Sequence, residues 1–244
     1  MIVLFTDYGW RGPYVGQMKA ACLQVAPTVP IIDLLHDAPV FDARASAHLL
    51  AAYTASFPRG TTFLCVVDPG VGSDCRQPVI LQVDGKWFVG PGNGLFDVVA
   101  QRGKAPQWWQ ITWQPQQLSD TFHGRDLFAP VAAQLALGKE PPGLPMAPPV
   151  LRQAPAFAEM LDYFCVIYID DFGNAITGLR GAVFSVEKTL QIGEHQVKYA
   201  RTFSEVAMGV AFWYENSSGL VEIAVNQGSA AKVLEISVGD TIAE

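Results

Sequence analysis

The sequence has few charged residues and no surplus of positive ones. Only 16% of its 244 residues are Asp, Glu, Lys or Arg, and the formal net charge at pH 7 is -7. Proteins that bind nucleic acid need clustered Lys and Arg to neutralise phosphates, so this composition argues against a nucleic-acid partner. An acidic surface instead favours a neutral or cationic small molecule as the ligand.

Cysteine is scarce, and long apolar runs are missing. None of the four cysteines forms a Cys-x-x-Cys pair, and three lie in or beside apolar runs, which is typical of buried small side chains rather than a disulfide scaffold. No apolar run approaches the ~20 residues of a membrane-spanning helix. The first residues, MIVLFTDYGW, lack the basic region of a signal peptide. We therefore expect a cytoplasmic protein with no membrane partner.

Several common catalytic motifs are also missing. The sequence contains no P-loop, no Gly-x-Ser-x-Gly elbow, no His-Glu-x-x-His and no dinucleotide-binding glycine pattern after its first strand. Three acids, Asp7, Asp37 and Asp68, nevertheless follow predicted strands, and carboxylates are suitable ligands for Mg²⁺. A divalent-metal-dependent nucleotide phosphatase therefore stays open at this point.

Residues 1–140 alternate between predicted strands and helices. Short apolar, β-branched runs predict strands at residues 2–6, 30–35 and 61–67, and helical spacing of apolar residues predicts a helix over 14–25. This alternation predicts an α/β domain with a mostly parallel sheet.

Two further helices are indicated by their ends. Asp42 is suited to cap the start of an Ala-rich helix, which Pro58 would end. A second helix is predicted over residues 125–137, where Gly138 would end it.

The amino-acid composition changes after residue 140. Residues 141–158 are rich in proline, which predicts an extended linker. Residues 159–244 show short β-like runs at close spacing and no helical period, so we expect a smaller C-terminal antiparallel β-barrel. So small a domain is weakly stable alone, and we expect it to pack on the first domain or on a neighbouring subunit.

Polar residues gather where predicted strands end, which is where open α/β sheets bind ligands. Asp7 follows the first strand and Asp68 follows the third. His123 lies in a loop beside Arg125 and Asp126, and clusters of titratable groups are enriched at functional sites. Each feature also has a purely structural reading: Asp7 as a helix cap, and the glycines after Asp68 as an ordinary tight turn.

Taken together, five segments are more specific than any one of them. In order, they are TDYGWRGPYVGQMKA, VVDPGVGSDCR, GPGNGLF, TFHGRDLFAP and YIDDFGNAIT. This series resembles the S-adenosylmethionine hydroxide adenosyltransferase family, the adenosine-forming S-adenosylmethionine hydrolases, which are relatives of the fluorinating and chlorinating enzymes. The resemblance runs from Thr6 to about Asn226.

The resemblance implies an α/β domain, a linker and a β-barrel, assembled as a homotrimer with its sites between subunits. It implies a hydrolase in which water attacks the ribose C5′ of S-adenosyl-L-methionine and releases adenosine and methionine. The leaving group is a neutral thioether and no phosphate is involved, so we expect no cofactor and no metal. The nucleoside and the sulfonium would be recognised by side chains alone.

Residue roles follow from the same resemblance. Asp68, Arg76 and His123 would be the catalytic residues: Asp68 accepts a hydrogen bond from water, Arg76 stabilises its charge, and His123 orients the water or relays its proton. The residues expected to bind substrate are Asp7, Phe122, Asp170, Phe172, Asn174, Phe203, Ser217, Ser218 and Asn226.

Other positions bear on the choice of nucleophile. The halogenating relatives carry Tyr at the position of Asp68 and Tyr-Ser at the positions of His123 and Gly124. A carboxylate would repel halide, so Asp68 favours water.

Some positions depart from the family pattern, namely Gly12, Cys75, Gly92, Gly178 and Ser218. An arginine would be expected one position before Arg76, where Cys75 stands. Because the altered contacts would weaken binding or turnover, a nucleoside-binding protein with little turnover is a third hypothesis.

Overall fold

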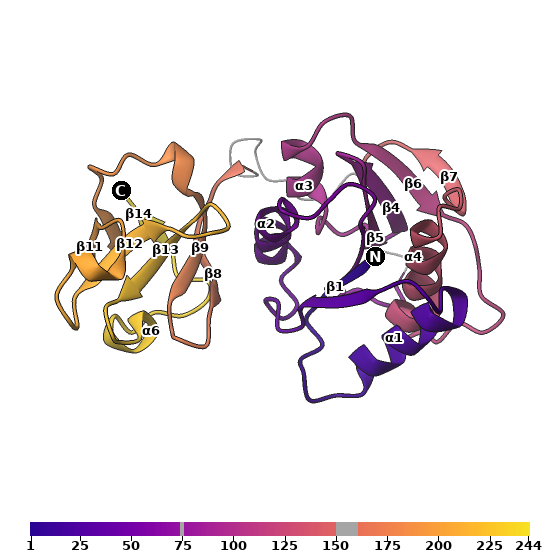
Figure 1. The fold of residues 1–244 in the computed structure, drawn as a ribbon, viewed down its shortest axis with the longest axis horizontal. Coiled ribbons are helices and arrows are strands. Elements are labelled where there is room, and N and C mark those ends of the chain that lie inside the picture. The colour runs from indigo at the N-terminus through magenta and orange to yellow at the C-terminus, as the bar shows by residue number, and fades with distance from the viewer. Residues whose placement is uncertain (74–75, 150–160) are drawn as a thin grey trace. The chain divides into compact units, whose positions relative to one another are not determined.

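The computed structural model describes residues 1–73, 76–149 and 161–244, and the chain forms two units, Met1–Ala154 and Pro155–Glu244 (Figure 1). The described strands of the N-terminal unit are β1 (Ile2–Thr6), β2 (Ile31–Leu35), β3 (Thr62–Val66), β4 (Pro78–Val83), β5 (Lys86–Pro91), β6 (Gln107–Ile111) and β7 (Gly143–Met146). Its described helices are α1 (Tyr14–Val25), α2 (Ala43–Thr54), α3 (Asp97–Arg102), the π-helical turn η1 (Gly124–Phe128) and α4 (Ala129–Ala136). None of the helices in these described ranges is long and apolar enough to cross a membrane.

The N-terminal strands form one mixed sheet in the order β2-β1-β3-β5-β4-β6-β7. The α/β class is confirmed, but only the four strands β2, β1, β3 and β5 run parallel, and the remaining pairs are antiparallel. The reason lies in the turn Asp84-Gly85, where both residues have positive φ and join β4 to β5 as a hairpin. A hairpin reverses the chain, so the sheet changes direction there.

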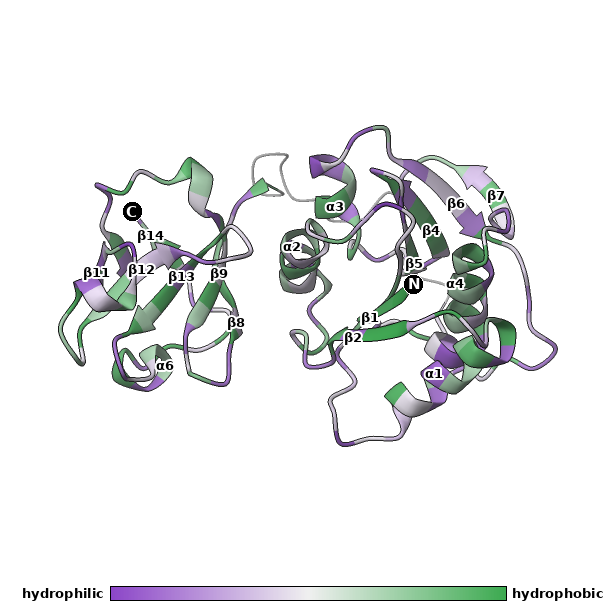
Figure 2. Ribbon diagram, in the orientation of Figure 1, coloured by the Kyte–Doolittle hydropathy of each residue, from purple (hydrophilic) through white to green (hydrophobic). Residues whose placement is uncertain are grey.

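Helices cover both faces of this sheet, with α1 and α4 on one side and α2 and α3 on the other (Figure 1). Every residue of β1 is buried, and Figure 2 shows β1 as mostly hydrophobic. A strand buried on both faces has no polar positions to alternate with apolar ones. This is why the run at residues 2–6 predicted the strand correctly.

The expected helices differ from the structure at two ends: α2 ends at Thr54 rather than beside Pro58, and the helix expected over residues 125–137 starts differently. Asp42 Oδ1 accepts a hydrogen bond from the backbone N–H of Ala45 at 2.9 Å, which confirms the expected cap of α2. The helix expected over residues 125–137 is different, because it starts with the π-helical turn η1 and only then becomes α4. Gly138 follows with φ +77, as its place at the helix end requires.

The proline-rich segment is not a linker over its whole length. Residues 143–146 form β7, which pairs antiparallel with β6. β7 is the last strand of the sheet, and an edge strand tolerates a proline such as Pro145 because one side of it needs no hydrogen bonds. Residues 150–158 of the expected linker lie outside the described residues.

The C-terminal unit contains a sheet that nearly closes on itself. Its described elements are β8 (Tyr163–Ile169), β9 (Ala175–Arg180), β10 (Leu190–Ile192), β11 (His195–Tyr199), β12 (Ala211–Glu215), β13 (Leu220–Val225), α6 (Ala230–Val233) and β14 (Ile242–Ala243). The strand order is β14-β10-β11-β12-β13-β9-β8, and an isolated bridge between Cys165 and Thr241 joins its two ends. The unit is therefore barrel-like, with one parallel pair, β11 with β12, among antiparallel ones.

Candidate active site

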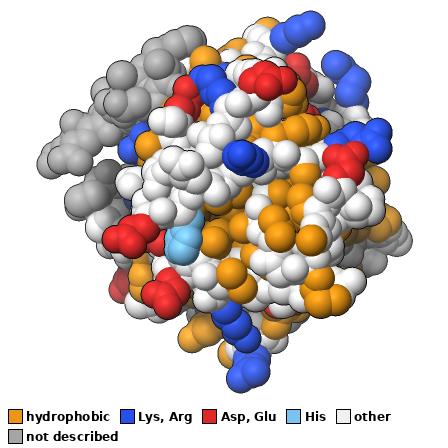
Figure 3. Space-filling model, turned by 90° about the vertical axis from the view of Figure 1, so that its left-hand side faces the viewer, with side chains coloured by type: hydrophobic (Ala, Val, Ile, Leu, Met, Phe, Trp, Pro, Cys, Tyr) orange, Lys and Arg blue, Asp and Glu red, His pale blue; other side chains and the backbone are white. Residues whose placement is uncertain are grey.

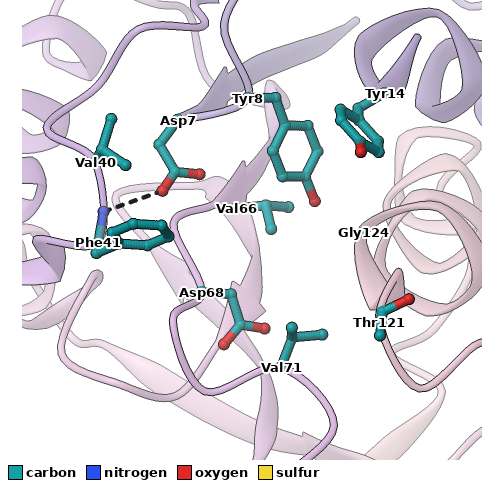
Figure 4. Close-up of a pocket in the computed structure, with 10 residues that line it drawn as sticks. All are labelled: Asp7, Tyr8, Tyr14, Val40, Phe41, Val66, Asp68, Val71, Thr121 and Gly124. Atoms are coloured by element: carbon teal, nitrogen blue, oxygen red, sulfur yellow. Dashed lines mark hydrogen bonds between the residues drawn. The ribbon is translucent and has the colours of Figure 1, made fainter. Parts of the chain in front are cut away.

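A pocket of about 390 Å³ opens in the N-terminal unit, beside the carboxyl ends of β1 and β3 (Figure 4). Both strands are parallel neighbours in the sheet, so the loops that follow them emerge at the same edge. The residues that line the pocket are Asp7, Tyr8, Tyr14, Val40, Phe41, Val66, Asp68, Val71, Thr121 and Gly124. The structure therefore brings together Asp7 and Asp68, which are 61 positions apart in the sequence.

Asp68 is held by a two-point ion pair with Arg76. The guanidinium Nε donates to Asp68 Oδ1 at 2.9 Å, and its Nη2 donates to Oδ2. Both side chains are almost fully buried, at 5% exposure for Arg76 and 4% for Asp68. The turn between them needs glycine: Gly72 has φ +77, and a Cβ there would lie 2.4 Å from the carbonyl oxygen of Asp120.

His123 joins this pair through the same guanidinium. Nη2 of Arg76 lies 3.0 Å from Nδ1 of His123. Because a guanidinium can only donate, Nδ1 must accept, and the neutral ring then carries its proton on Nε2. Burial and the positive charge of Arg76 lower the pKa of His123, which favours this neutral form.

The π-helical turn places Gly124 in the pocket lining, whereas His123 is not a lining residue and is linked to Asp68 through Arg76. His123 is the residue before η1, and Gly124 is its first residue. Single π-helical turns are frequent at functional sites. Apolar periodicity alone could not reveal this turn, because residues 124–128 have the same spacing whether the helix is α or π.

Asp7 lies on the opposite wall of the pocket. Its Oδ2 accepts a hydrogen bond from the backbone N–H of Phe41 at 3.2 Å (Figure 4). Burial raises the pKa of Asp7, and the charge of Asp68 raises it further, against the effect of the backbone hydrogen bonds. Phe41 itself has φ 61, a strained value for a residue with a side chain, and is 73% exposed.

Aromatic residues that sequence reasoning missed form much of the pocket wall. Tyr8, Tyr14 and Phe41 all line it. Phe122, which we expected to bind substrate, is 9% exposed and packs edge-on against Tyr8 and Tyr14. In the described structure Phe122 therefore supports the wall from behind. The only sequence signal for Tyr8 and Tyr14 as pocket residues was their place among glycines in the segment after the first strand.

The substrate residues expected in the C-terminal unit begin in the turn between β8 and β9. The Asp170 carboxylate accepts hydrogen bonds from the backbone N–H of Phe172 at 3.0 Å and of Asn174 at 2.8 Å. The Asn174 side-chain amide donates to its other oxygen at 3.2 Å. Asp170 thus shapes the turn, and Phe172 projects from it with 80% of its surface exposed.

Tyr214 links this turn to the other expected residues. Its ring packs edge-on against Phe203 at 5.6 Å, and its hydroxyl donates to the buried Glu222. Burial, that hydrogen bond and the charges of Glu222 and Asp170 raise the pKa of Tyr214. Asn216 donates to the other oxygen of Glu222 at 2.9 Å and accepts from the backbone of Ser218.

The remaining two expected residues lie on the same unit. Ser217 is exposed in the turn between β12 and β13. Asn226 follows β13 and donates from its side chain to the carbonyl of Val206 at 2.8 Å.

Family models match both units of the chain. Residues 2–144 match the SAM hydroxide adenosyltransferase N-terminal domain, and residues 164–243 match the C-terminal domain of the same family. The chain belongs to this family. A protein named (R)-S-adenosyl-L-methionine hydrolase from Thermus thermophilus is 38% identical over 98% of this chain and 96% of its own.

Other relatives agree along nearly the whole length. A protein with the same name from Salinispora arenicola is 35% identical over 97% of this chain and 94% of its own. The crystal structure of an uncharacterized conserved protein from Thermotoga maritima has a TM-score of 0.86 and 32% identity, and covers 99% of this chain and 98% of that one. The resemblance read from the five segments is thereby confirmed at the level of the family.

Two departures from the SAM hydroxide adenosyltransferase pattern have local physical reasons. A Cβ at Gly178 would lie 2.6 Å from the carbonyl oxygen of Tyr163, its partner across the β8–β9 pair. A Cβ at Gly92 would lie 2.8 Å from the carbonyl oxygen of Gln77. Both glycines therefore fit close backbone contacts. Cys75 lies outside the described residues, whereas Arg76 occupies the position that pairs with Asp68.

The acids that suggested a metal site are not arranged as metal ligands. Within the described ranges, no group of three or more His, Cys, Asp or Glu residues is placed to hold a metal ion. Asp37 is exposed and does not line the pocket. Asp68 gives both oxygens to Arg76, and a guanidinium is a poor neighbour for a divalent cation.

Proposed function

We propose that this chain hydrolyses S-adenosyl-L-methionine to adenosine and L-methionine. Membership of the family over both units and the names of its full-length relatives support this. The single observation that carries the chemistry is the ion-paired Asp68 in the pocket wall, with His123 joined to the same guanidinium.

The reaction is a displacement at carbon. The water oxygen forms a bond to C5′, the C5′–S bond breaks, and its electron pair goes to sulfur, which leaves as the neutral thioether of methionine. The water releases one proton, which passes to Asp68 and then to solvent. The leaving group needs no protonation, so the protein has to position water, accept its proton and align it with the C5′–S bond.

Each side chain has a defined part in this. Asp68 accepts a hydrogen bond from water through a lone pair that Arg76 leaves open, and His123 donates from Nε2. Asp7 accepts hydrogen bonds from the ribose hydroxyls. Positioning of the reactants contributes up to about 7–11 kcal/mol, and proton removal by a side chain contributes about 10²–10⁴-fold in rate.

The charge of the pocket suits a cationic substrate. Asp7 and Asp68 line it, and Arg76 neutralises only one of these two charges. Excess negative charge in a cleft raises the local concentration of a cation such as a sulfonium. It also opposes the entry of halide, in keeping with water as the nucleophile.

We further propose a homotrimer with its sites between subunits. Asp170, Phe172, Asn174, Phe203, Ser217, Ser218 and Asn226 would contribute the C-terminal half of the substrate site. The C-terminal unit exposes large apolar side chains, Phe164, Phe172, Val183, Val186, Met208, Val210, Val233 and Val238. Figure 3 shows one face on which apolar side chains gather among charged ones. Such patches favour association, which light scattering would measure.

We also place the enzyme in the cytoplasm. Cys22, Cys65 and Cys165 are free, buried thiols, and unpaired thiols suit a reducing compartment.

One assay tests the activity. Purified protein is incubated with S-adenosyl-L-methionine, with and without EDTA, and the release of adenosine is followed by chromatography. The isosteric variant Asp68→Asn is assayed in the same way. We expect adenosine from the wild type in both conditions and about 10²–10⁴-fold less from the variant. Hydrolysis of nucleotide monophosphates that EDTA abolishes would indicate the phosphatase instead. Tight adenosine binding by calorimetry without turnover would indicate a nucleoside-binding protein.

A further inference from the structure

Tyr8 places a hydroxyl group in the same pocket as Asp68. Its ring packs against those of Phe122 and Tyr14, with centroid distances of 5.8 Å and 5.7 Å, and those two rings also pack against each other at 5.4 Å. Figure 4 shows the hydroxyl directed towards the part of the pocket bordered by Asp68, Val71, Thr121 and Gly124, and away from Asp7. The ring is therefore fixed by packing while its polar end faces the cavity.

The residue opposite this hydroxyl is a glycine for a steric reason. A Cβ on Gly124 would lie 2.4 Å from the Tyr8 hydroxyl oxygen, whereas the next nearest atom, Met18 Sδ, would lie 3.1 Å away. The hydroxyl is thus the group that a side chain at position 124 would displace. Gly124 is buried and lines the pocket, so the wall is shaped around the hydroxyl.

The hydroxyl is also left available for a ligand. The backbone N–H of Tyr8 donates to Thr6 Oγ1 at 3.3 Å, and no hydrogen bond among the described residues uses its hydroxyl. Burial and the charges of Asp7 and Asp68 raise the pKa of Tyr8, against the smaller effect of Arg76. The phenol therefore stays protonated over the working pH range, and its neutral oxygen can accept a hydrogen bond as well as donate one.

We propose that the Tyr8 hydroxyl is a further catalytic group, whose oxygen accepts a hydrogen bond from the attacking water and which Gly124 keeps in place. This rests on the proposed hydrolysis. Because Asp7 is assigned to the ribose hydroxyls, Asp68 accepts only one of the two O–H groups of the water, and the second needs another acceptor. The Tyr8 oxygen accepts that second O–H group, Nε2 of His123 donates to one water lone pair, and the other lone pair is left to attack C5′.

The test is the variant Tyr8→Phe, which removes one oxygen atom and keeps the packed ring. We expect kcat to fall by about tenfold or more, with KM within about threefold, because the hydroxyl acts on water rather than on substrate. The pH profile of kcat should keep its shape, since Tyr8 does not titrate in that range. Tyr199→Phe is the matched control: Tyr199 packs on Trp213 in the other unit, and its loss of a hydroxyl should leave kcat unchanged.

A double-mutant cycle with Gly124→Ala tests the second part. Alone, this variant should lower kcat about as much as Tyr8→Phe, because its methyl displaces the hydroxyl. In the Tyr8→Phe background it should lower kcat by less than about twofold, since the two changes remove the same contact.

The possible outcomes distinguish failure of this proposal from failure of the proposed function. An active wild type with an equally active Tyr8→Phe variant overturns this proposal alone, as does a change confined to KM. Additive losses in the cycle overturn the role given to Gly124. A wild type that releases no adenosine overturns the proposed function, and this proposal with it.

Discussion

Arg76 and Asp68 form an ion pair in which two donors of one guanidinium meet the two oxygens of one carboxylate, and both side chains are at most 5% exposed. Burying such a pair costs free energy because both groups lose their hydration, and removal of one partner leaves an uncompensated charge. The same guanidinium fixes the tautomer of His123. Arg76 therefore acts on both groups that we propose to contact the attacking water.

Replacing Arg76 with lysine should inactivate the enzyme although the charge is kept. An ammonium is a point donor and cannot span both oxygens of Asp68 and reach Nδ1 of His123 at once. We expect kcat to fall by at least about 10²-fold, measured as adenosine release.

The matched control for this variant is Arg180→Lys. Arg180 makes the same two-point pair with Asp162, through Nε at 3.0 Å and Nη2 at 2.5 Å, outside the pocket. Its kcat should stay within about twofold of the wild type, because a partly exposed pair contributes little. Equal losses in both lysine variants would mean that general destabilisation, not the site, explains the effect.

Activity should fall on the acid side of neutrality because of His123. Burial and the charge of Arg76 lower its pKa below the ordinary value of 6.5, and protonation would put an N–H against the guanidinium. We expect kcat/KM to be level above pH 6.5 and to fall as the pH drops through this lowered pKa. A rise in kcat/KM towards pH 5 would contradict the assigned tautomer.

The same group makes stability depend on pH. The unfolded chain binds the histidine proton at a higher pH than the folded chain does, so unfolding is favoured as acid is added. The contribution of His123 is full above pH 6.5 and is lost as the pH falls through the folded-state pKa. Thermal melts of His123→Asn should therefore lose stability less steeply between pH 7 and 5 than melts of the wild type.

Asp7 should show a conflict between stability and binding. Burial raises its pKa, with the charge of Asp68 acting in the same direction, so its ionised form destabilises the fold at pH 7. Asp7→Asn should raise the melting temperature at pH 7 and should also raise KM by about ten- to a hundred-fold, since charged hydrogen bonds to the ribose are lost. An unchanged KM would place the ribose elsewhere.

The sequence predicted those parts of the molecule that depend on local chemistry. The buried strand at residues 2–6, the cap at Asp42 and the ends of strands that carry Asp7 and Asp68 all follow from short-range patterns. It missed β7, because Pro145 reads as a linker unless the strand is known to lie at a sheet edge.

The candidate site likewise has some features that short-range patterns predict and others that arise only in the folded chain. Asp68, Arg76 and His123 were recognisable from motifs, but the shared guanidinium is a contact between residues 47 positions apart that no local pattern encodes. The need for glycine at position 124, within the π-helical turn, comes from the close approach of the Tyr8 hydroxyl, which only the folded chain supplies. Phe41 gave no sequence signal, because its position follows from a backbone strain at φ 61.

Glu222 should be important for the stability of the C-terminal unit. Its buried carboxylate accepts from the Tyr214 hydroxyl and from the Asn216 amide. Glu222→Gln keeps only one acceptor oxygen, so either the Tyr214 hydroxyl loses its acceptor or the new NH₂ faces that of Asn216, whose oxygen is already engaged by the backbone of Ser218 and Leu220. We expect a loss of about 1–3 kcal/mol in the free energy of unfolding, measured in denaturant.

The control for this is Glu215→Gln on the neighbouring strand. Glu215 is exposed, so the substitution should change the free energy of unfolding by less than about 0.5 kcal/mol. Equal effects at both positions would mean that net charge, and not the buried network, governs the result.

A side chain at position 178 should destabilise this chain. A Cβ there would lie 2.6 Å from both Cβ and the carbonyl oxygen of Tyr163, so Gly178→Asn forces β8 and β9 apart. We expect a loss of about 1–3 kcal/mol in the free energy of unfolding and no gain in kcat. Gly16→Ala is the opposite case, because Gly16 lies within α1 with nothing within 4 Å of its Cβ position, and alanine should stabilise by about 0.5–1 kcal/mol. A stabilised Gly178→Asn variant would show that β8 can shift, and that the departure at Gly178 has a cause other than packing.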